Sequence, residues 1–93
     1  MFEFDPDKSA VNAAKHGIDF VQAQALWDDE FAIIIPSTQR HEGEDRQLRI
    51  ARLGDRIWTA IVTDRRGTIR IISVRRARDY EEAAYEQARQ DDR

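Results

Sequence analysis

Two short glycine-containing turns constrain the fold of this chain more than any other sequence feature: Gly54-Asp55-Arg56 and Arg65-Arg66-Gly67. They separate three runs rich in β-branched and other apolar residues, at 46–53, 57–64 and 68–76. Glycine-containing connections of this length join neighbouring antiparallel strands as hairpins. The three runs therefore predict three consecutive antiparallel strands.

A fourth strand is expected earlier in the chain. Residues 31–35 form a β-branched apolar run, and Pro36 either ends this strand or confines it to a sheet edge. Residues 37–45 are polar and predict a loop, whereas 2–4 alternate and are a candidate extra edge strand. These runs predict a four-stranded antiparallel meander.

Helix signals precede the meander. Asp5 and Pro6 are typical of an N-cap and a first helical residue, and Gly17 is typical of a helix end. Asp19 can cap a second short helix whose apolar residues include Phe20. We therefore expect two N-terminal helices, closely joined.

A third helix is expected after the meander. Asp79 and Glu82 have the spacing of a capping box, which predicts a helix over about 80–89. Its sheet-facing residues are expected to be Ala83, Ala84, Tyr85 and Ala88. The fold class is α+β, and 93 residues at 10.9 kDa fit a single domain over 1–93.

Several function classes are excluded by composition. The chain has no cysteine, so disulfides, thiolate zinc sites and cysteine nucleophiles are ruled out. Metal-ligand spacings of histidine or aspartate and phosphate-loop glycines are also missing, so we expect no metal and no cofactor. The longest apolar stretch, 31–35, is far below the roughly 18 residues of a membrane span. The opening residues lack a signal-peptide layout, and we expect a cytoplasmic protein.

Charge is distributed unevenly along the chain. Residues 1–45 carry 3 Lys/Arg against 10 Asp/Glu, and residues 79–93 carry 2 against 6. Residues 46–78 carry 10 basic residues against 2 acidic ones, and all ten are arginine. Arginine binds phosphate through a planar, bidentate fork. The middle of the chain is thus a candidate phosphate-binding region, or a solvated face paired with the acidic helices.

Arginines of the last strand are the leading site candidates. Strict alternation would place Arg70, Ile72, Val74 and Arg76 on one face, and Ile69, Ile71, Ser73 and Arg75 on the other. Cross-strand neighbours lie about 5 Å apart, so Arg46, Arg49 and Arg52 could join them in a cluster suited to a phosphodiester. The equally weighted alternative is that Arg75 or Arg76 pairs with Glu81 or Glu82 and fixes the last helix.

Histidines and aromatic residues supply further candidates. His16 and His41 could each take a proton from a ribose 2′-OH. His16 could instead interact with a helix dipole. The side chains of Trp27, Trp58 and Tyr80 could stack on bases or pack in the core, and Tyr85 could present its hydroxyl at the mouth of the sheet.

Three segments together resemble the BrnT toxins of bacterial type II toxin–antitoxin systems. They are Phe4-Asp5-x-x-Lys8-x-x-x-Asn12-x-x-Lys15-His16-Gly17-Ile18-x-Phe20-x-x-Ala23, Gly43-Glu44-x-Arg46, and Arg70-Ile71-Ile72-Ser73-x-Arg75-Arg76-Ala77 followed by Glu82 and Tyr85. The resemblance covers about 2–85. The chain departs from the family pattern at Val74, where alanine is usual, and at Phe4, where tryptophan is frequent.

This resemblance implies a compact RelE-like fold and a ribonuclease that lowers translation. It also implies neutralisation by a ribbon-helix-helix, BrnA-like antitoxin, in a hetero-oligomer such as a 2:2 assembly that binds its own promoter DNA through the antitoxin.

The resemblance agrees with the arginine-rich strands, the candidate histidine and the lack of a metal-ligand pattern. Together they predict a metal-independent endoribonuclease of the mRNA interferase type. Phosphate binding and transition-state stabilisation are assigned to Arg70, Arg75 and Arg76, and proton transfer to His16 with Lys15. The expected RNA-binding residues are Arg46, Arg49, Arg52, Trp58, Arg78 and Tyr85.

Two other functions share these residues. One is a non-catalytic RNA-binding or antitoxin-docking module, which would be a degenerate toxin. The other is an acidic interaction partner whose arginines are all salt-bridged, with weak, salt-insensitive RNA affinity, whereas true phosphate binding weakens steeply with salt.

Overall fold

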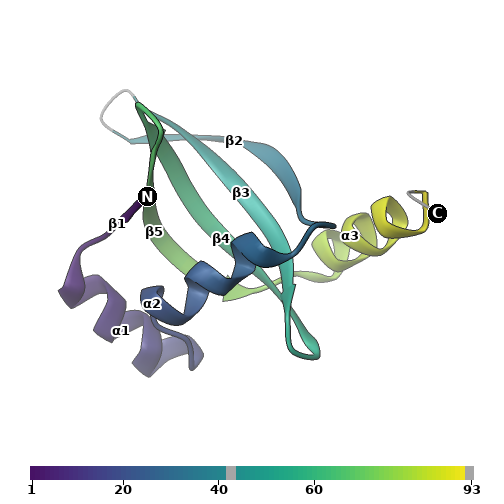
Figure 1. The fold of residues 1–93 in the computed structure, drawn as a ribbon, viewed down its shortest axis with the longest axis horizontal. Helices are drawn as coiled ribbons and strands as arrows, with labels where there is room; N and C mark the ends of the chain where they lie inside the picture. The colour runs from purple at the N-terminus through teal and green to yellow at the C-terminus, as the bar shows by residue number, and fades with distance from the viewer. Residues whose placement is uncertain (42–43, 92–93) are drawn as a thin grey trace.

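A mixed sheet forms the centre of the molecule in the computed structural model, which describes residues 1–41 and 44–91 (Figure 1). The elements in chain order are β1 (Phe2–Glu3), α1 (Pro6–His16), α2 (Phe20–Ala23), the 3₁₀ helix η1 (Gln24–Asp28), β2 (Ile33–His41), β3 (Glu44–Leu53), β4 (Arg56–Arg65), β5 (Thr68–Arg76) and α3 (Asp79–Asp91). The α+β class is confirmed. Within these ranges, no helix is long and apolar enough to cross a membrane.

The sheet has five strands across the described ranges, in the order β1-β5-β4-β3-β2. β2 to β5 form the expected antiparallel meander, and β1 adds to β5 in the parallel direction. The backbone N–H of Ile69 donates to the carbonyl of Met1 at 2.9 Å, which extends this pairing by one bond. The candidate edge strand at 2–4 is therefore confirmed as β1. The prediction of a purely antiparallel four-stranded sheet is wrong in detail, because this short N-terminal segment pairs in parallel with part of the free edge of β5.

β2 is longer than expected. It continues through Pro36 to His41, and β3 begins at Glu44, so the predicted loop at 37–45 is wrong for its described residues. Of that loop, 42–43 lie outside the described residues. Pro36 fits in β2 because this strand is the sheet edge, where one missing N–H breaks no ladder on the outer side. A register shift between Pro36 and Arg40 accompanies it.

The predicted helix caps at the N-terminus are confirmed, but the second helix differs in detail, because it is α-helical only over Phe20–Ala23 and continues as the 3₁₀ helix η1. The Asp5 side chain accepts from the backbone N–H of Asp7 at 2.9 Å, and Gly17 ends α1 with a φ of 79°. Asp19 and Gln22 form a capping box at the start of α2. These caps satisfy backbone groups that a helix end leaves without partners.

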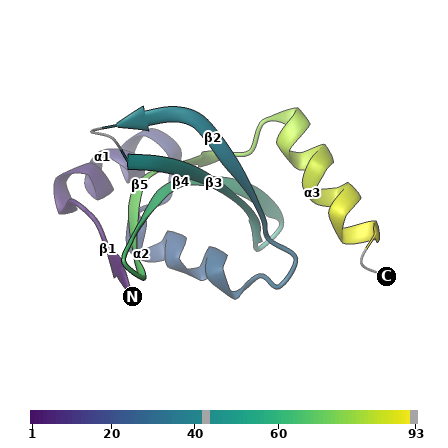
Figure 2. The ribbon, with the colours of Figure 1, turned by 90° about the horizontal axis from the view of Figure 1, so that it is seen from above.

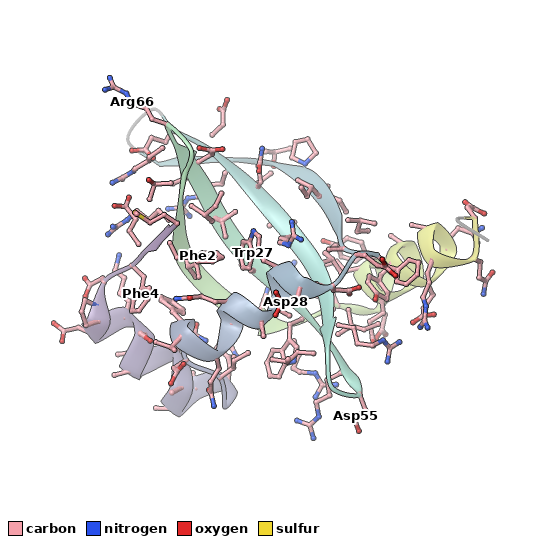
Figure 3. The ribbon with its side chains drawn as sticks, viewed as in Figure 1. Phe2, Phe4, Trp27, Asp28, Asp55 and Arg66 are labelled. Carbon is pink, nitrogen blue, oxygen red and sulfur yellow. The ribbon has the colours of Figure 1, made fainter. Side chains whose placement is uncertain are left out.

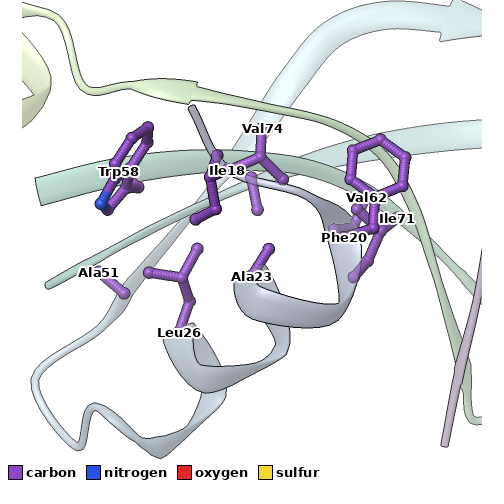
Figure 4. Packing of buried hydrophobic residues seen from close by; sticks show 10 residues of the cluster. Ile18, Phe20, Ala23, Leu26, Ala51, Trp58, Val62, Ile71 and Val74 are labelled. Carbon is purple, nitrogen blue, oxygen red and sulfur yellow. The ribbon is translucent and has the colours of Figure 1, made fainter. Parts of the chain in front are cut away.

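The main core lies between the N-terminal helices and one face of the sheet (Figure 4). Apolar side chains of the helical region pack on small and branched residues of β3, β4 and β5. The buried members are Ile18, Phe20, Ala23, Leu26, Ala51, Trp58, Ala60, Val62, Ile71 and Val74. An edge-to-face contact joins Phe2 to Trp27 at the side of this core (Figure 3), and a second such contact joins Phe4 to Phe20. Burying this face leaves the opposite face of the sheet to α3 and to solvent.

α3 packs at one end of that opposite face, away from α1 and α2 (Figure 2). Tyr85, only 1% exposed, forms a second small core with Ile50 and Ile57. The expected orientation of α3 is partly wrong, since Ala83 is exposed. The Asp79–Glu82 capping box is also wrong, because α3 begins one residue earlier than expected and the carboxylate of Glu81, not Glu82, accepts from the N–H of the residue before the helix.

Asn12 ties α1 to the edge of β5. Its side-chain amide donates to the carbonyls of Ile18 and Val74 at 2.8 and 2.9 Å, and its oxygen accepts from the N–H of Val74 at 3.1 Å. β1 pairs with β5 only at Ile69 and Arg70, so the N–H and C=O of Val74 have no strand partner on that side. Asn12 thus takes the place of a strand at this edge.

We expect Asn12→Ala to lower the free energy of unfolding by about 2–4 kcal/mol, because it leaves buried backbone groups without partners. Val11→Ala, one residue away and 57% exposed, is the control and should change stability by less than about 0.5 kcal/mol. Urea denaturation followed by circular dichroism measures both. Equal stability of the two variants would show that Asn12 does not hold α1 on the sheet.

Candidate functional site

Part of the sheet face opposite α1 and α2 is left open by α3, and it contains two adjoining hollows. The first is lined by Lys8, Glu44, Arg46, Thr63, Arg65, Arg70 and Ile72. The second is lined by Ile35, Pro36, Ser37, Thr38, Arg46, Leu48, Ile61, Ile72, Ser73, Arg75, Arg78 and Tyr80. Arg46 and Ile72 line both hollows, so we treat the two as one surface, the open face.

An extra residue in β5 shapes this surface. Ile61 of β4 is opposite Ser73, but the next residue, Val62, is opposite Ile71, so Ile72 is inserted as a β-bulge. A bulge shifts the alternation of side chains by one position.

Because of the bulge, residues before and after Ile72 are grouped on the two faces of β5 differently from the prediction. Ile71 and Val74 both point into the main core, which strict alternation would forbid. Arg70 and Arg75 both line the open face, although alternation assigns them to opposite faces. That part of the sequence prediction is wrong, because it assumed an unbroken period of two.

Arg75 is held by a buried carboxylate. Its guanidinium forms two hydrogen bonds to Glu81, from Nη1 at 2.7 Å and from Nη2 at 3.0 Å, and Glu81 is 0% exposed. The same carboxylate accepts from the hydroxyl of Thr59 at 3.0 Å and from the N–H of Arg78 at 2.8 Å. The predicted alternative, in which Arg75 pairs with Glu81 and fixes the last helix, is confirmed.

Burial by itself would raise the pKa of the Glu81 carboxyl. The hydrogen bonds from Arg75, Arg78 and Thr59 outweigh burial and lower this pKa to about 2. The hydrogen bond to Glu81 in turn raises the pKa of Arg75. The pair is therefore fully ionised at neutral pH, and it anchors α3 beside the second hollow.

Arg46, in contrast to Arg75, is not paired with a carboxylate of the described residues. Its Nε is buried without a hydrogen-bond partner, and within 1–41 and 44–91 its guanidinium takes part in no hydrogen bond or ion pair. It lies between the two hollows with Arg70 on the same face. A charged fork without a protein partner can bind an anion that enters either hollow.

Glu44 is the carboxylate in the first hollow. It accepts from Nε of Arg65 at 3.0 Å and forms an ion pair with Nη2 of Arg65 at 2.9 Å. The hydroxyl of Thr63 lies 3.2 Å from the carboxylate and 3.0 Å from the carbonyl of Asp45, to which it can also donate. The hydrogen bond from Arg65 is the main reason that the pKa of Glu44 lies below its ordinary value. Arg70 forms a long ion pair with Glu3 at 3.9 Å, and its charge also contributes to the lowered pKa of Glu44. The hollow thus combines an ionised carboxylate with cations from α1, β3 and β5.

Three arginines predicted to bind RNA or phosphate stack on aromatic rings instead. Arg49 lies over Trp27 with its guanidinium carbon 4.9 Å from the ring centre, and Arg76 lies over Trp58 at 5.6 Å. Arg52 lies over the Tyr85 ring at 5.9 Å and pairs with Glu86 at 2.9 Å. None of the three lines the open face.

The two predicted aromatic RNA-binding residues lie in the cores. Trp58 is 6% exposed within the main core, and the hydroxyl of Tyr85 donates to Asp29 at 2.7 Å. Packing, which the sequence also allowed for Trp58, accounts for both rings.

Lys15 and His16 are exposed at the end of α1. They line a recess between this helix and β5 that shares Lys8 and Ile72 with the first hollow. The structure therefore brings Arg46, Arg70, Arg75 and Arg78 together on the open face, and it places Lys15 and His16 along its rim.

Sequence reasoning missed Lys8, Glu44, Thr63 and Arg65 as site residues. A signal for Glu44 was present, because it stands two residues before Arg46 and a strand places such residues on one face. In the described part of the chain, no group of three or more His, Asp or Glu side chains is arranged to hold a metal ion.

The model of a family described as the ribonuclease toxin, BrnT, of type II toxin–antitoxin systems matches residues 4–81. No curated protein matches the chain. The matched range includes every strand from β2 to β5, α1, and the Arg75–Glu81 pair.

We expect Glu81→Gln to lower the free energy of unfolding by about 3 kcal/mol at neutral pH, because it leaves Arg75 without its counter-charge. Since the folded-state pKa of Glu81, about 2, lies below its ordinary value of 4.5, the stabilisation is present above pH 4.5 and is lost as the pH falls toward 2. The gap between wild type and variant should therefore shrink at pH 3.

Urea denaturation at pH 7 and pH 3 measures this gap. Glu82→Gln, in the same helical turn and with no ion pair in the described structure, is the matched control. A gap of equal size at both pH values would contradict the ionised pair.

Proposed function

The chain belongs to the BrnT family of ribonuclease toxins from type II toxin–antitoxin systems, and from this membership we propose that it inhibits translation by cutting RNA on its open face. The observation that carries the proposal is the first hollow. There Arg46 and Arg70 lie beside the ionised carboxylate of Glu44. Cations bind a phosphodiester, and a carboxylate next to them can accept a proton.

Phosphate binding is assigned to Arg46, Arg70 and Lys8. As the 2′-oxygen attacks, negative charge builds on the phosphorus oxygens, and fixed guanidinium groups stabilise it. Arg46 is best suited because no described group competes for its Nη atoms. Arg75 contributes positive potential, but its hydrogen bonds already go to Glu81.

Proton acceptance is assigned to Glu44. In this step the 2′-OH gives its proton to the carboxylate and the 2′-oxygen forms a bond to phosphorus. The bond from phosphorus to the 5′-oxygen breaks, and the leaving 5′-oxygen takes a proton from solvent water. The products are a 2′,3′-cyclic phosphate and a 5′-hydroxyl, and no metal is needed. Arg65 holds the carboxylate through a hydrogen bond from Nε and an ion pair from Nη2, and a lone pair of the carboxylate remains for the proton.

The earlier assignment of proton transfer to His16 with Lys15 receives less support. Both side chains line the recess beside α1, whereas Glu44 lies in the same hollow as Arg46 and Arg70. Their place on the rim instead suits contact with RNA that leaves the open face.

As a type II toxin, the protein has a cognate antitoxin partner. We further propose that the fold is RelE-like and that the antitoxin is a BrnA-like ribbon-helix-helix protein. The complex, a 2:2 assembly, would repress its own promoter through the antitoxin. The alternative, a degenerate toxin that only binds RNA or antitoxin, predicts that no phosphodiester is cut.

We expect Arg46→Ala to lower the rate of RNA cleavage by about 100-fold, because it removes a donor to the charge that develops on phosphate. The matched control is Arg56→Ala, which removes an exposed arginine that does not line either hollow of the open face. Cleavage of a labelled single-stranded RNA by purified protein measures both rates, and growth after induction in a bacterial host reports toxicity. Similar losses in the two variants would point to net charge instead of this site.

Glu44→Gln is expected to abolish cleavage while RNA binding is kept or strengthened, because a repelling charge is replaced by a neutral amide. The lowered pKa keeps Glu44 ionised at neutral pH, so wild-type cleavage should decline only as the pH falls through the acidic range. Glu30→Gln, on the exposed surface, is the control for charge. A Glu44→Gln protein that still cuts RNA at the wild-type rate would overturn the assignment.

A further inference from the structure

The second hollow differs in chemistry from the first. Its floor is aliphatic, formed by Ile35, Leu48, Ile61 and Ile72. Hydroxyl groups and guanidinium groups stand around this floor, from Ser37, Thr38, Ser73, Arg75 and Arg78. A phosphate would gain nothing from an apolar floor, whereas a flat ring with polar edges fits both features.

Tyr80 completes this hollow at the start of α3. It is 61% exposed, whereas every other aromatic side chain of the protein is buried or half-buried. Its hydroxyl forms no hydrogen bond with a described residue. An exposed ring without a hydrogen bond contributes little to the stability of the fold, so stability does not explain a tyrosine at this position.

The position of Tyr80 is nevertheless fixed. The next residue is Glu81, whose carboxylate is held by Arg75, Thr59 and the N–H of Arg78. These bonds hold the first turn of α3 against the sheet, and Tyr80 with it. An aromatic side chain on this fixed backbone, at the edge of an apolar hollow, is a platform on which a base can stack.

We propose that the second hollow binds an unpaired nucleobase of the RNA substrate, stacked on Tyr80 above the aliphatic floor. The inference rests on the proposed function and adds its substrate class, single-stranded RNA, because a paired base cannot enter the hollow. Arg46, which lines both hollows, binds the phosphate that joins this nucleotide to the scissile position. Arg78 donates hydrogen bonds to the edge of the base.

Binding of short RNAs tests the proposal. The probes are four-nucleotide RNAs with 2′-O-methyl groups, which cannot be cut, together with versions that each lack one base. Fluorescence anisotropy gives the dissociation constant for wild type, Tyr80→Ala, Tyr80→Phe and the control Val21→Ala, which is 63% exposed on α2. Thermal melts establish that each variant is folded.

We expect Tyr80→Ala to weaken binding of the complete RNA about tenfold, in line with the loss of one stacked base. Tyr80→Phe and Val21→Ala should bind as wild type does. For the RNA that lacks the stacked base, wild type and Tyr80→Ala should bind equally. A loss of the same size on every abasic RNA, or no loss on the complete one, would overturn the base site.

The same experiment separates the two proposals. Wild-type protein that binds these probes through Tyr80 but does not cut unmodified RNA would refute the ribonuclease proposal and support the base site. If wild-type protein cuts RNA and Tyr80→Ala does not change binding, the ribonuclease proposal is supported and the base site is refuted. Protein that neither binds nor cuts RNA would overturn both.

Discussion

The inserted residue Ile72 in β5 is the constraint on which the rest of the structure depends. It lets Ile71 and Val74 both enter the core while Arg70 and Arg75 both face the opposite side. Without the bulge, one of these pairs would be split, and either a charge would face the core or an apolar side chain would face solvent. Asn12 then binds the backbone of Val74 just beyond the bulge, and Arg75 binds Glu81 to place α3. The main core, α1 and α3 are therefore all connected to the part of β5 around Ile72.

The arginines of residues 46–78 carry the same charge but differ in the side chains that they contact. Arg49 and Arg76 cover tryptophan rings, and Arg75 is neutralised by a buried carboxylate, so their charges support the fold. Arg46 has no such partner in the described structure, and Arg70 has a long ion pair with Glu3 and no hydrogen bond to a described carboxylate. The two lie together in one hollow. The positive charge that is available for phosphate is therefore concentrated on the open face.

Local signals in the sequence predicted local structure well. The side chains of Asp5 and Asp19 cap their own helices, and Gly17 ends α1 because it adopts a left-handed φ. The bounds of β5 match the run between its flanking turn and the last helix. The parallel pairing of β1 and the bulge at Ile72 depend on contacts between distant segments, which no local pattern encodes. The prediction of the site likewise succeeded where local sequence decides and failed where contacts between distant segments decide. Arginines near Arg70 were identified by type, but whether each meets phosphate, an aromatic ring or Glu81 depends on the register of neighbouring strands.

The central claim is that RNA lies on the open face, across the first hollow. Backbone amide chemical shifts during titration with an uncleavable 2′-O-methyl RNA locate the bound strand directly. If the claim holds, the largest changes occur at residues that line the hollows, such as Arg46, Thr63 and Arg70, and those at Gly17, Arg56 and Trp58 on the opposite face stay small. Changes concentrated on that opposite face, with Arg46 and Arg70 unaffected, would contradict it.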